Sequence, residues 1–287
     1  MGTTANDSAS SEIIMTTSRA KILLQGDSLT QLCWEGWGAH LANVYQRRAD
    51  VVARGYGGYN TRMYLRLPFD PTLTNGDVAL AVLFLGANDS GLPELAAHHH
   101  VPIPEYKANL KILIERLRDQ YKLRQNNNHI LLISPTPVHH EQRFKYQKVR
   151  YGDKATGVLE RTLENTQKYV IACQEVAKEE DLPFLNLYQT MLDDGDDWGR
   201  FLNDGLHFSA AGHEFVGKAV VKAINEAFPE LAVIADSKTG QWCNSGSTCT
   251  GLPNHGGPFH DEIDNDDPDK AFQPRARNKR KEPAASS

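Results

Sequence analysis

Five short apolar runs, separated by stretches with helical periodicity, constrain the fold of this chain more than any other feature of its sequence. The runs are almost continuously apolar, which is typical of strands that are covered on both faces. We therefore predict an α/β fold, a three-layer α/β/α sandwich with a central five-stranded parallel sheet, and functional residues at the carboxyl ends of the strands. The expected strands are Lys21–Gln25, Asp50–Ala53, Val78–Leu85, His129–Ser134 and Pro183–Leu187.

Three stretches between and after these runs repeat apolar residues at helical spacing, at Leu110–Leu117, Tyr169–Val176 and Val216–Ala223. Such spacing predicts helices that turn one apolar face towards the sheet. Pro104 is expected to begin the first helix, and Ser209 is expected to cap the last.

Apolar periodicity is confined to the middle of the 287 residues. Residues 1–18 are small and polar, and residues 238–287 are dominated by Gly, Ser, Asn, Pro and charged side chains. Segments of that composition bury too little apolar surface to fold. We therefore predict one domain at 19–237, flanked by a disordered N-terminal segment and a disordered C-terminal tail.

The composition excludes several classes of function. The formal net charge is −5, so there is no global basic field to attract nucleic acid or an anionic membrane surface. The longest apolar run, Val78–Ala87, is too short to cross a bilayer, which takes about 20 residues, and no signal peptide is visible. The four cysteines form no CxxC pair, so neither a disulfide framework nor a zinc knuckle is expected. We predict a cytoplasmic protein that does not insert into membranes; a homodimer stays open.

The first strand runs directly into Gly26-Asp27-Ser28-Leu29-Thr30, which places a serine on a turn ahead of a helix. That position suits a nucleophile, but it equally suits a helix N-cap. The turn is not a GxSxG elbow, and no GxSxG occurs in the chain, so an ordinary α/β-hydrolase is disfavoured.

Two further turns follow the second and third strands. The third strand ends in Gly86-Ala87-Asn88-Asp89, where the Asn88 amide offers a donor for an oxyanion or, alternatively, forms a local Asx-turn. After the second strand, Gly57 and Gly58 permit unusual backbone angles and expose N–H groups. Asn60 stands where a dinucleotide fingerprint needs its third glycine, so NAD binding is not expected.

Near the end of the predicted domain, Asp204-Gly205-Leu206-His207 precedes the helix that Ser209 is expected to cap. A carboxylate three residues from an imidazole can fix its tautomer, although a surface Asp–His pair would look the same. The serine, glycine, asparagine and Asp/His turns are all predicted at one edge of one sheet. This convergence favours an active site over four unrelated turns.

These motifs resemble, in order, the blocks of the GDSL or SGNH hydrolases, a family with a flavodoxin-like fold. Gly26-Asp27-Ser28-Leu29 resembles the first block, Gly58 the second, Gly86-Ala87-Asn88-Asp89 the third and Asp204-Gly205-Leu206-His207 the fifth. The resemblance covers essentially the whole predicted domain. One departure is Ala53-Arg54, where many members carry an Asn a few residues before the glycine turn.

The neighbouring residues are similar to the branch of isoamyl acetate-hydrolysing esterases. The matching stretches are Gly58-Tyr59-Asn60-Thr61-Arg62, His100-Val101-Pro102 and Ser134-Pro135-Thr136-Pro137. The resemblance implies a serine esterase for small acetate-type esters, with a small-molecule substrate and no metal or organic cofactor. It also implies that Ser28, Asp204 and His207 are catalytic, and that Ser28, Gly58 and Asn88 form the oxyanion hole.

Alternatives remain on the same residues: an acyltransferase, a lipase-like or lysophospholipase-like hydrolase, or a non-catalytic binding module. No lid or large apolar insertion is evident in the sequence, which favours short acyl groups. Trp34 and Trp37 follow the nucleophile turn and either line an acyl pocket or pack in the core. The runs His98-His99-His100 and His139-His140 lack the spacing of metal ligands.

Overall fold

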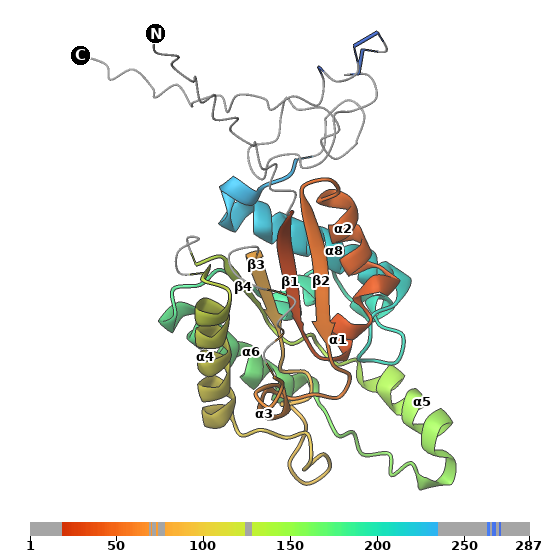
Figure 1. Cartoon of the computed structure of the whole chain (residues 1–287). Helices are drawn as coiled ribbons and strands as arrows, with labels where there is room; N and C mark the ends of the chain where they lie inside the picture. The colour runs from red at the N-terminus through yellow and green to blue at the C-terminus, as the bar shows by residue number, and fades with distance from the viewer. Residues whose placement is uncertain are drawn as a thin grey trace, which may run out of the picture. The chain divides into compact units, whose positions relative to one another are not determined.

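The computed structural model describes residues 19–68, 70, 73, 78–123, 128–234, 263–264, 266–267 and 270. Its sheet has five parallel strands in the order β2-β1-β3-β4-β5, which confirms the predicted fold class (Figure 1). The chain passes from β1 to β2 on one side of β1 and then to β3 on its other side, and such a switch point opens a crevice at the carboxyl ends of the strands. The strands are β1 (Ala20–Gly26), β2 (Ala49–Gly55), β3 (Val78–Phe84), β4 (Ile130–Ile133) and β5 (Phe184–Leu185).

Helices fill the connections between the strands. The α-helices are α1 (Ser28–Gln31), α2 (Trp37–Val44), α3 (Thr61–Tyr64), α4 (Ile103–Gln120), α5 (His140–Tyr151), α6 (Leu163–Glu179), α7 (Leu187–Leu192) and α8 (Ala210–Ala227). Short 3-10 turns lie at η1 (Cys33–Glu35), η3 (Gly152–Lys154), η4 (Trp198–Phe201) and η5 (Pro229–Leu231).

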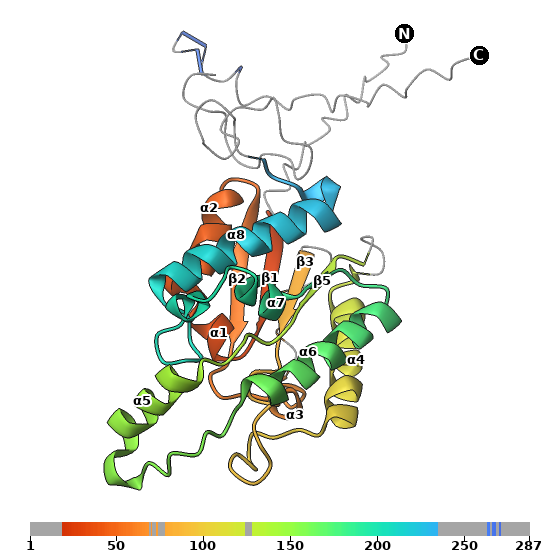
Figure 2. The ribbon, with the colours of Figure 1, turned by 180° about the vertical axis from the view of Figure 1, so that it is seen from behind.

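The sheet separates two apolar clusters, one under each helical layer. Alternate residues of a strand point to opposite faces, so Leu24 packs in the cluster of α2 and α8, whereas Leu23 packs in that of α4 and α6. Figure 2 shows α8 crossing one face of the sheet, with α6 and α4 on the other side. This is the three-layer arrangement that the continuous apolar strands predict.

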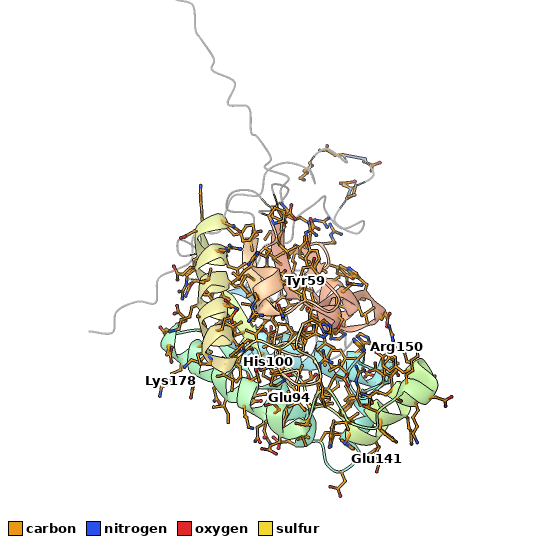
Figure 3. The ribbon with its side chains drawn as sticks, turned by 90° about the horizontal axis from the view of Figure 1, so that it is seen from below. Tyr59, Glu94, His100, Glu141, Arg150 and Lys178 are labelled. Atoms are coloured by element: carbon orange, nitrogen blue, oxygen red, sulfur yellow. The ribbon has the colours of Figure 1, made fainter. Side chains whose placement is uncertain are left out.

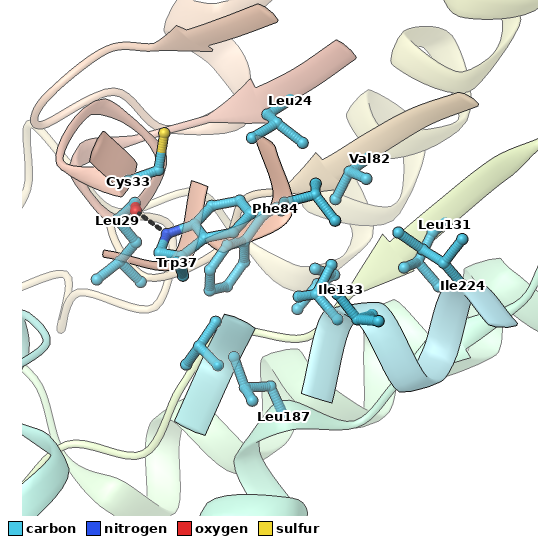
Figure 4. Close-up of a cluster of buried hydrophobic side chains, with 14 of the residues drawn as sticks. Leu24, Leu29, Cys33, Trp37, Val82, Phe84, Leu131, Ile133, Leu187 and Ile224 are labelled. Carbon is cyan, nitrogen blue, oxygen red and sulfur yellow. Dashed lines mark hydrogen bonds between the residues drawn. The ribbon is translucent and has the colours of Figure 1, made fainter. Parts of the chain in front are cut away.

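Trp37 anchors the layer next to the first strand. Its ring is fully buried against Phe84, and its Nε1 donates a hydrogen bond of 2.8 Å to the carbonyl oxygen of Leu29 (Figure 4). Because Leu29 lies in the short helix α1, this bond fixes α1 on the core. A buried aromatic thereby holds the backbone beside Ser28.

The structure differs from the sequence prediction at a few helices. Helix α4 begins at Ile103, so Pro104 is its second residue, while Ser209 caps α8 as predicted, its Oγ accepting from the Gly212 N–H at 3.1 Å. Helices α2 and α5 were not predicted. The predicted disordered segments 1–18 and 238–287 lie outside the described residues, apart from Ile263, Asp264, Asp266, Asp267 and Lys270.

Candidate active site

Ser28 stands where β1 ends and α1 begins. The side chain of the preceding Asp27 is the helix cap, because its Oδ1 accepts from the Leu29 N–H at 2.9 Å. Ser28 is therefore the first residue of the helix and not its cap, so the N-cap interpretation of this serine is wrong. Its Oγ is left to lie 3.0 Å from Nε2 of His207.

Two glycines let α1 approach the strand ends at backbone distance. A Cβ built on Gly26 would lie 2.2 Å from Thr30 Oγ1 and 2.4 Å from the carbonyl oxygen of Phe84. A Cβ on Gly55 would lie 2.0 Å from the backbone nitrogen of Gln31. Neither position has room for a side chain, so the turn that carries the serine rests directly on strand backbone.

The imidazole of His207 bridges the serine and a carboxylate. Its Nδ1 lies 2.9 Å from Asp204 Oδ2, and Asp204 Oδ1 accepts from the backbone N–H groups of Leu206 at 3.0 Å and His207 at 2.7 Å. The carboxylate accepts at Nδ1, so the geometry assigns the proton to Nδ1 and leaves the Nε2 lone pair facing Ser28. The arrangement is that of a nucleophile, a base and an orienting acid.

Asp204 stays ionised despite being mostly buried. Burial by itself would raise the pKa of its carboxyl, but the hydrogen bonds from the side chain and backbone of His207 and the positive charge of Arg143 hold that pKa well below its usual range. Arg143 donates from Nη1 to Asp204 Oδ2 at 3.1 Å. The carboxylate thus keeps its charge opposite the imidazole at neutral pH.

Gly58 and Asn88 face the same cavity as Ser28 and His207. This cavity has a volume of about 530 Å³ and opens at the carboxyl ends of the strands. Gly58 has φ of +79°, a left-handed conformation that suits glycine. Within the described part of the chain, no hydrogen-bond acceptor is paired with the backbone N–H of Ser28 or of Gly58.

The Asn88 amide is held from both ends. Its Nδ2 donates to the carbonyl oxygen of Tyr59 at 2.9 Å, and its Oδ1 accepts from Nη2 of Arg161 at 2.8 Å. Because Nδ2 carries two hydrogens, one of them is left for a ligand in the cavity. No Asx-turn of Asn88 is found among its hydrogen bonds, so that interpretation is wrong.

The glycine turn is held by residues other than the asparagine that many family members carry near Ala53-Arg54. Gln31 Oε1 accepts from the Gly57 N–H at 2.6 Å, and Asn60 Nδ2 donates to the carbonyl oxygen of His99 at 2.7 Å. The turn is thereby tied to α1 on one side and to the loop after β3 on the other. Arg54 points elsewhere, pairing with Asp70 at 2.6 Å.

A segment that sequence analysis did not assign forms much of the cavity wall. Eleven of the twenty lining residues fall between Arg143 and Arg161, in α5, η3 and the loop that leads to α6. The segment carries Arg143, Arg150, Lys154 and Glu160, so it is not the large apolar insertion whose absence the sequence indicates. Figure 1 shows α5 projecting beyond the end of the sheet, and Figure 3 shows Tyr59, His100 and Arg150 on different segments around this end.

Helix α5 begins against the loop that carries the Asp/His pair. The backbone N–H of His139 donates to the carbonyl oxygen of Gly205 at 2.9 Å. Gly205 has φ of +80°, and a Cβ there would lie 2.5 Å from the Arg143 backbone nitrogen and from the His139 carbonyl oxygen. Only glycine fits this contact.

The remaining aromatic and histidine candidates separate into different roles. Neither Trp34 nor Trp37 lines the cavity, so the pocket interpretation is wrong and core packing is right for Trp37. His98 and His99 do line it, and burial lowers the pKa of His99 to about 4, which leaves that ring neutral. His139 caps α5. The described residues contain no group of three or more metal-binding side chains.

Asp89, next to Asn88, is fully buried with one oxygen unpaired. Its Oδ1 accepts from Thr61 N and Oγ1, while no described residue is bonded to Oδ2. Burial raises the pKa of Asp89 to about 7, although the bonds from Thr61 lower it. A pKa above the unfolded value of about 3.9 means that the folded state loses stability as pH rises between these values.

We therefore expect Asp89→Asn to change how stability depends on pH. The melting temperature of the variant, relative to wild type, should rise between about pH 4 and pH 7, because the amide never has to be buried as an anion. Thermal unfolding over this range measures the effect, with the exposed Asp196→Asn as control. Parallel curves for Asp89→Asn and wild type would contradict the prediction.

Comparison with known proteins gives a consistent result. The profile of the GDSL-like lipase/acylhydrolase family matches residues 24–215. A GDSL esterase/lipase of Arabidopsis thaliana is 34% identical over 90% of this chain and 99% of its own length. The isoamyl acetate-hydrolyzing esterase 1 homolog of Homo sapiens is 37% identical over 75% of this chain and 92% of its own. The isoamyl acetate-hydrolyzing esterase of Saccharomyces cerevisiae is 31% identical over 73% and 88%.

Among solved structures, a lipase/acylhydrolase from Enterococcus faecalis has a TM-score of 0.54 at 24% identity, covering 72% of this chain and 96% of its own. This likeness supports the fold. None of the described helices is both long and apolar enough to cross a membrane. The profile match over two thirds of the chain and the relatives above 30% identity show that the protein is a carboxylic ester hydrolase and belongs to the GDSL-like lipase/acylhydrolase family.

Proposed function

We propose that the protein is a serine esterase that hydrolyses small, acetate-type esters through an acyl-enzyme on Ser28. The observation that carries this proposal is the continuous contact from Ser28 Oγ through His207 to Asp204, at 3.0 and 2.9 Å, inside a cavity that also holds Asn88 and Gly58. A nucleophile, its base and hydrogen-bond donors for an oxyanion are the groups that acyl transfer needs.

In the proposed reaction, Ser28 Oγ attacks the ester carbonyl carbon while Nε2 of His207 takes the hydroxyl proton. The bond to the alcohol oxygen then breaks, and His207 returns the proton to that oxygen. Water attacks the acyl-enzyme in the same way, giving its proton to His207, and the acid leaves as Ser28 regains a proton. Asp204 accepts a hydrogen bond from the Nδ1–H group throughout, and its negative charge stabilises the imidazolium.

The negative oxygen of each tetrahedral intermediate would be bound by the backbone N–H groups of Ser28 and Gly58 and by Asn88 Nδ2. All three line the same cavity, and the two N–H groups have no acceptor among the described residues. A single donor of this kind is worth about 2.7–4 kcal/mol in the transition state.

Two observations support short acyl groups. The relatives from Homo sapiens and Saccharomyces cerevisiae are named for the hydrolysis of isoamyl acetate. The cavity wall carries charged side chains, with Arg143, Arg150, Lys154 and Glu160 among its residues. Each CH₂ gains about 0.8 kcal/mol only where apolar surface can cover it, and a charged wall covers little.

We therefore predict that the rate of hydrolysis falls as the acyl chain of the ester lengthens. With p-nitrophenyl esters from two to about twelve acyl carbons, kcat/KM should be greatest for the shortest. Rates at matched subsaturating concentrations measure this series. A maximum at about eight carbons or more would instead favour the lipase-like or lysophospholipase-like alternative.

The acyl-enzyme itself is tested by covalent labelling. A fluorophosphonate probe should react with the wild-type protein, and peptide mass spectrometry should place the label on Ser28. Ser28→Ala is the control, since it keeps the fold and lacks the nucleophile. A label elsewhere, or none, would contradict the acyl-enzyme and favour a binding module.

A cytoplasmic location and the lack of a nucleic-acid partner complete the proposal, and both rest on the formal charge of −5 and the apolar pattern.

A further inference from the structure

A chain of buried charged side chains connects Asp204, beside His207, to Asn88. It starts at Asp204, which binds Arg143 Nη1 at 3.1 Å, and continues from Arg143 Nη2 to Glu160 Oε1 at 2.6 Å. Glu160 Oε1 also binds Arg161 Nη1 at 3.0 Å. Arg161 Nη2 then donates to Asn88 Oδ1 at 2.8 Å. The carboxylate beside His207 is thus connected to the amide that faces the oxyanion.

The members of this chain are buried and balanced. The side chains of Arg161, Arg143 and Glu160 are 4%, 9% and 18% exposed. Together with Asp204 they make two guanidinium groups and two carboxylates. A buried ion pair contributes little net stability, because desolvation offsets the attraction, so stability alone is a poor reason for four such charges beside one cavity.

Arg161 fixes which way the Asn88 amide points. Its Nε donates to the Ala87 carbonyl oxygen at 2.8 Å, so its guanidinium is bound to the loop that carries Asn88. A guanidinium has donors only, and it can therefore bind the amide oxygen but never the NH₂ group. With Oδ1 held by Arg161, the Asn88 NH₂ must face Tyr59 and the cavity; the flipped amide would turn an oxygen towards the oxyanion.

Glu160 sets the position of both guanidiniums. Its Oε1 accepts from Arg143 and Arg161, its Oε2 accepts from Gln147 Nε2 at 2.5 Å, and its backbone oxygen accepts from the Leu92 N–H at 2.8 Å. The residue is thus tied to α5 by its side chain and to the loop after β3 by its backbone. It lies at the centre of the chain of charges.

We propose that Arg161 is a positioning residue that orients the Asn88 amide for the oxyanion, and that Glu160 couples this orientation to the Asp204–His207 pair through Arg143. The inference rests on the proposed function, since it assigns partners to the residues that the esterase would use. It adds a second layer of the site, drawn from the segment between β4 and α6, on which none of the four sequence blocks lies.

A double-mutant cycle tests the role of Arg161, with p-nitrophenyl acetate as substrate. Arg161→Met should lower kcat by about 10- to 100-fold, with KM changed by less than about threefold, because the amide is needed chiefly in the transition state. In an Asn88→Ala background the same substitution should change kcat by less than about twofold, since the amide that it orients is gone. A merely structural role would give a similar loss in both backgrounds.

Further variants keep the test decisive if Arg161→Met folds poorly. Arg161→Lys retains the positive charge, but a lysine cannot bind Ala87, Asn88 and Glu160 at once. Glu160→Gln retains the shape of the side chain but loses its negative charge. Each variant should lower kcat by about tenfold. The matched control is Arg118→Met, because Arg118 is also a buried arginine, 7% exposed and paired with Glu115 and Glu180, but does not line the cavity. Its kcat should equal that of wild type.

The outcomes separate the two proposals. Multiplicative losses in the cycle, or a change confined to KM, would overturn the positioning role while leaving the esterase intact. Retention of activity by Ser28→Ala in the same assay would overturn the acyl-enzyme first. Normal kcat in Arg161→Met, with Ser28→Ala inactive, would overturn only the inference drawn here.

Discussion

Ser28→Ala and His207→Ala are each expected to lower kcat by about 10⁴-fold or more, because a nucleophile and its base act as one unit and the loss of either removes the acyl-enzyme route. The Oγ–Nε2 distance of 3.0 Å is the structural reason to treat the two as a unit. The double variant should therefore be no worse than either single one. Steady-state kinetics on p-nitrophenyl acetate measure all three.

Folding must be checked alongside this result. Both side chains lie at the cavity and neither belongs to the apolar clusters, so melting temperatures should stay close to wild type. A Ser28→Ala protein that keeps more than about a tenth of the wild-type kcat would contradict the assigned nucleophile. Ser209→Ala, which removes the cap of α8, serves as a serine control that touches stability without touching the cavity.

Asn88→Ala is expected to lower kcat by about 10²–10³-fold and to leave KM almost unchanged, since an oxyanion donor acts mainly in the transition state. The substitution also leaves Arg161 Nη2 without its acceptor in a buried site. A buried unpaired donor costs about 1–3 kcal/mol, so a lower melting temperature should accompany the kinetic loss. Kinetics and thermal unfolding together separate the two effects.

An increase in KM at constant kcat would show that Asn88 binds the ground-state ester, and the oxyanion assignment would then be withdrawn. The relevant comparison is Asn165→Ala, because Asn165 also donates to a backbone oxygen near this loop, that of Ser90 at 2.8 Å, but does not line the cavity. Its kcat should remain near that of wild type.

Strands β1, β3 and β4 were predictable because they are largely buried on both faces and therefore mostly apolar, whereas the edge strands β2 and β5 are only partly buried. The helices were harder to predict from the sequence. The spacing of Trp37, Leu41 and Val44 is helical and carries the signal for α2. Helix α5 has no such signal, because its buried residues are Arg143 and Gln147. These side chains are held by ion pairs and hydrogen bonds and not by apolar packing.

The candidate site divides in the same way. The predicted site residues follow strand ends or recognisable turns. Ser28, Gly58, Asn88 and His207 line one cavity, and Asp204 lies 2.9 Å from Nδ1 of His207. Glu160 and Arg161 lie in a loop without periodicity, and nothing in the neighbouring sequence indicates that Arg161 reaches Asn88. Their role depends on a contact between residues 73 positions apart, which only the folded chain makes visible.

The absence of side chains at Gly26 and Gly55 has a consequence for changing this enzyme by mutation. Because each Cβ would fall within 2.5 Å of neighbouring atoms, any substitution pushes α1 away from the sheet, and Ser28 moves with it. An activity screen of random variants would therefore reject changes at two positions that touch no substrate. Engineering of the substrate range has more freedom at exposed residues such as Lys154, which line the cavity without supporting the serine.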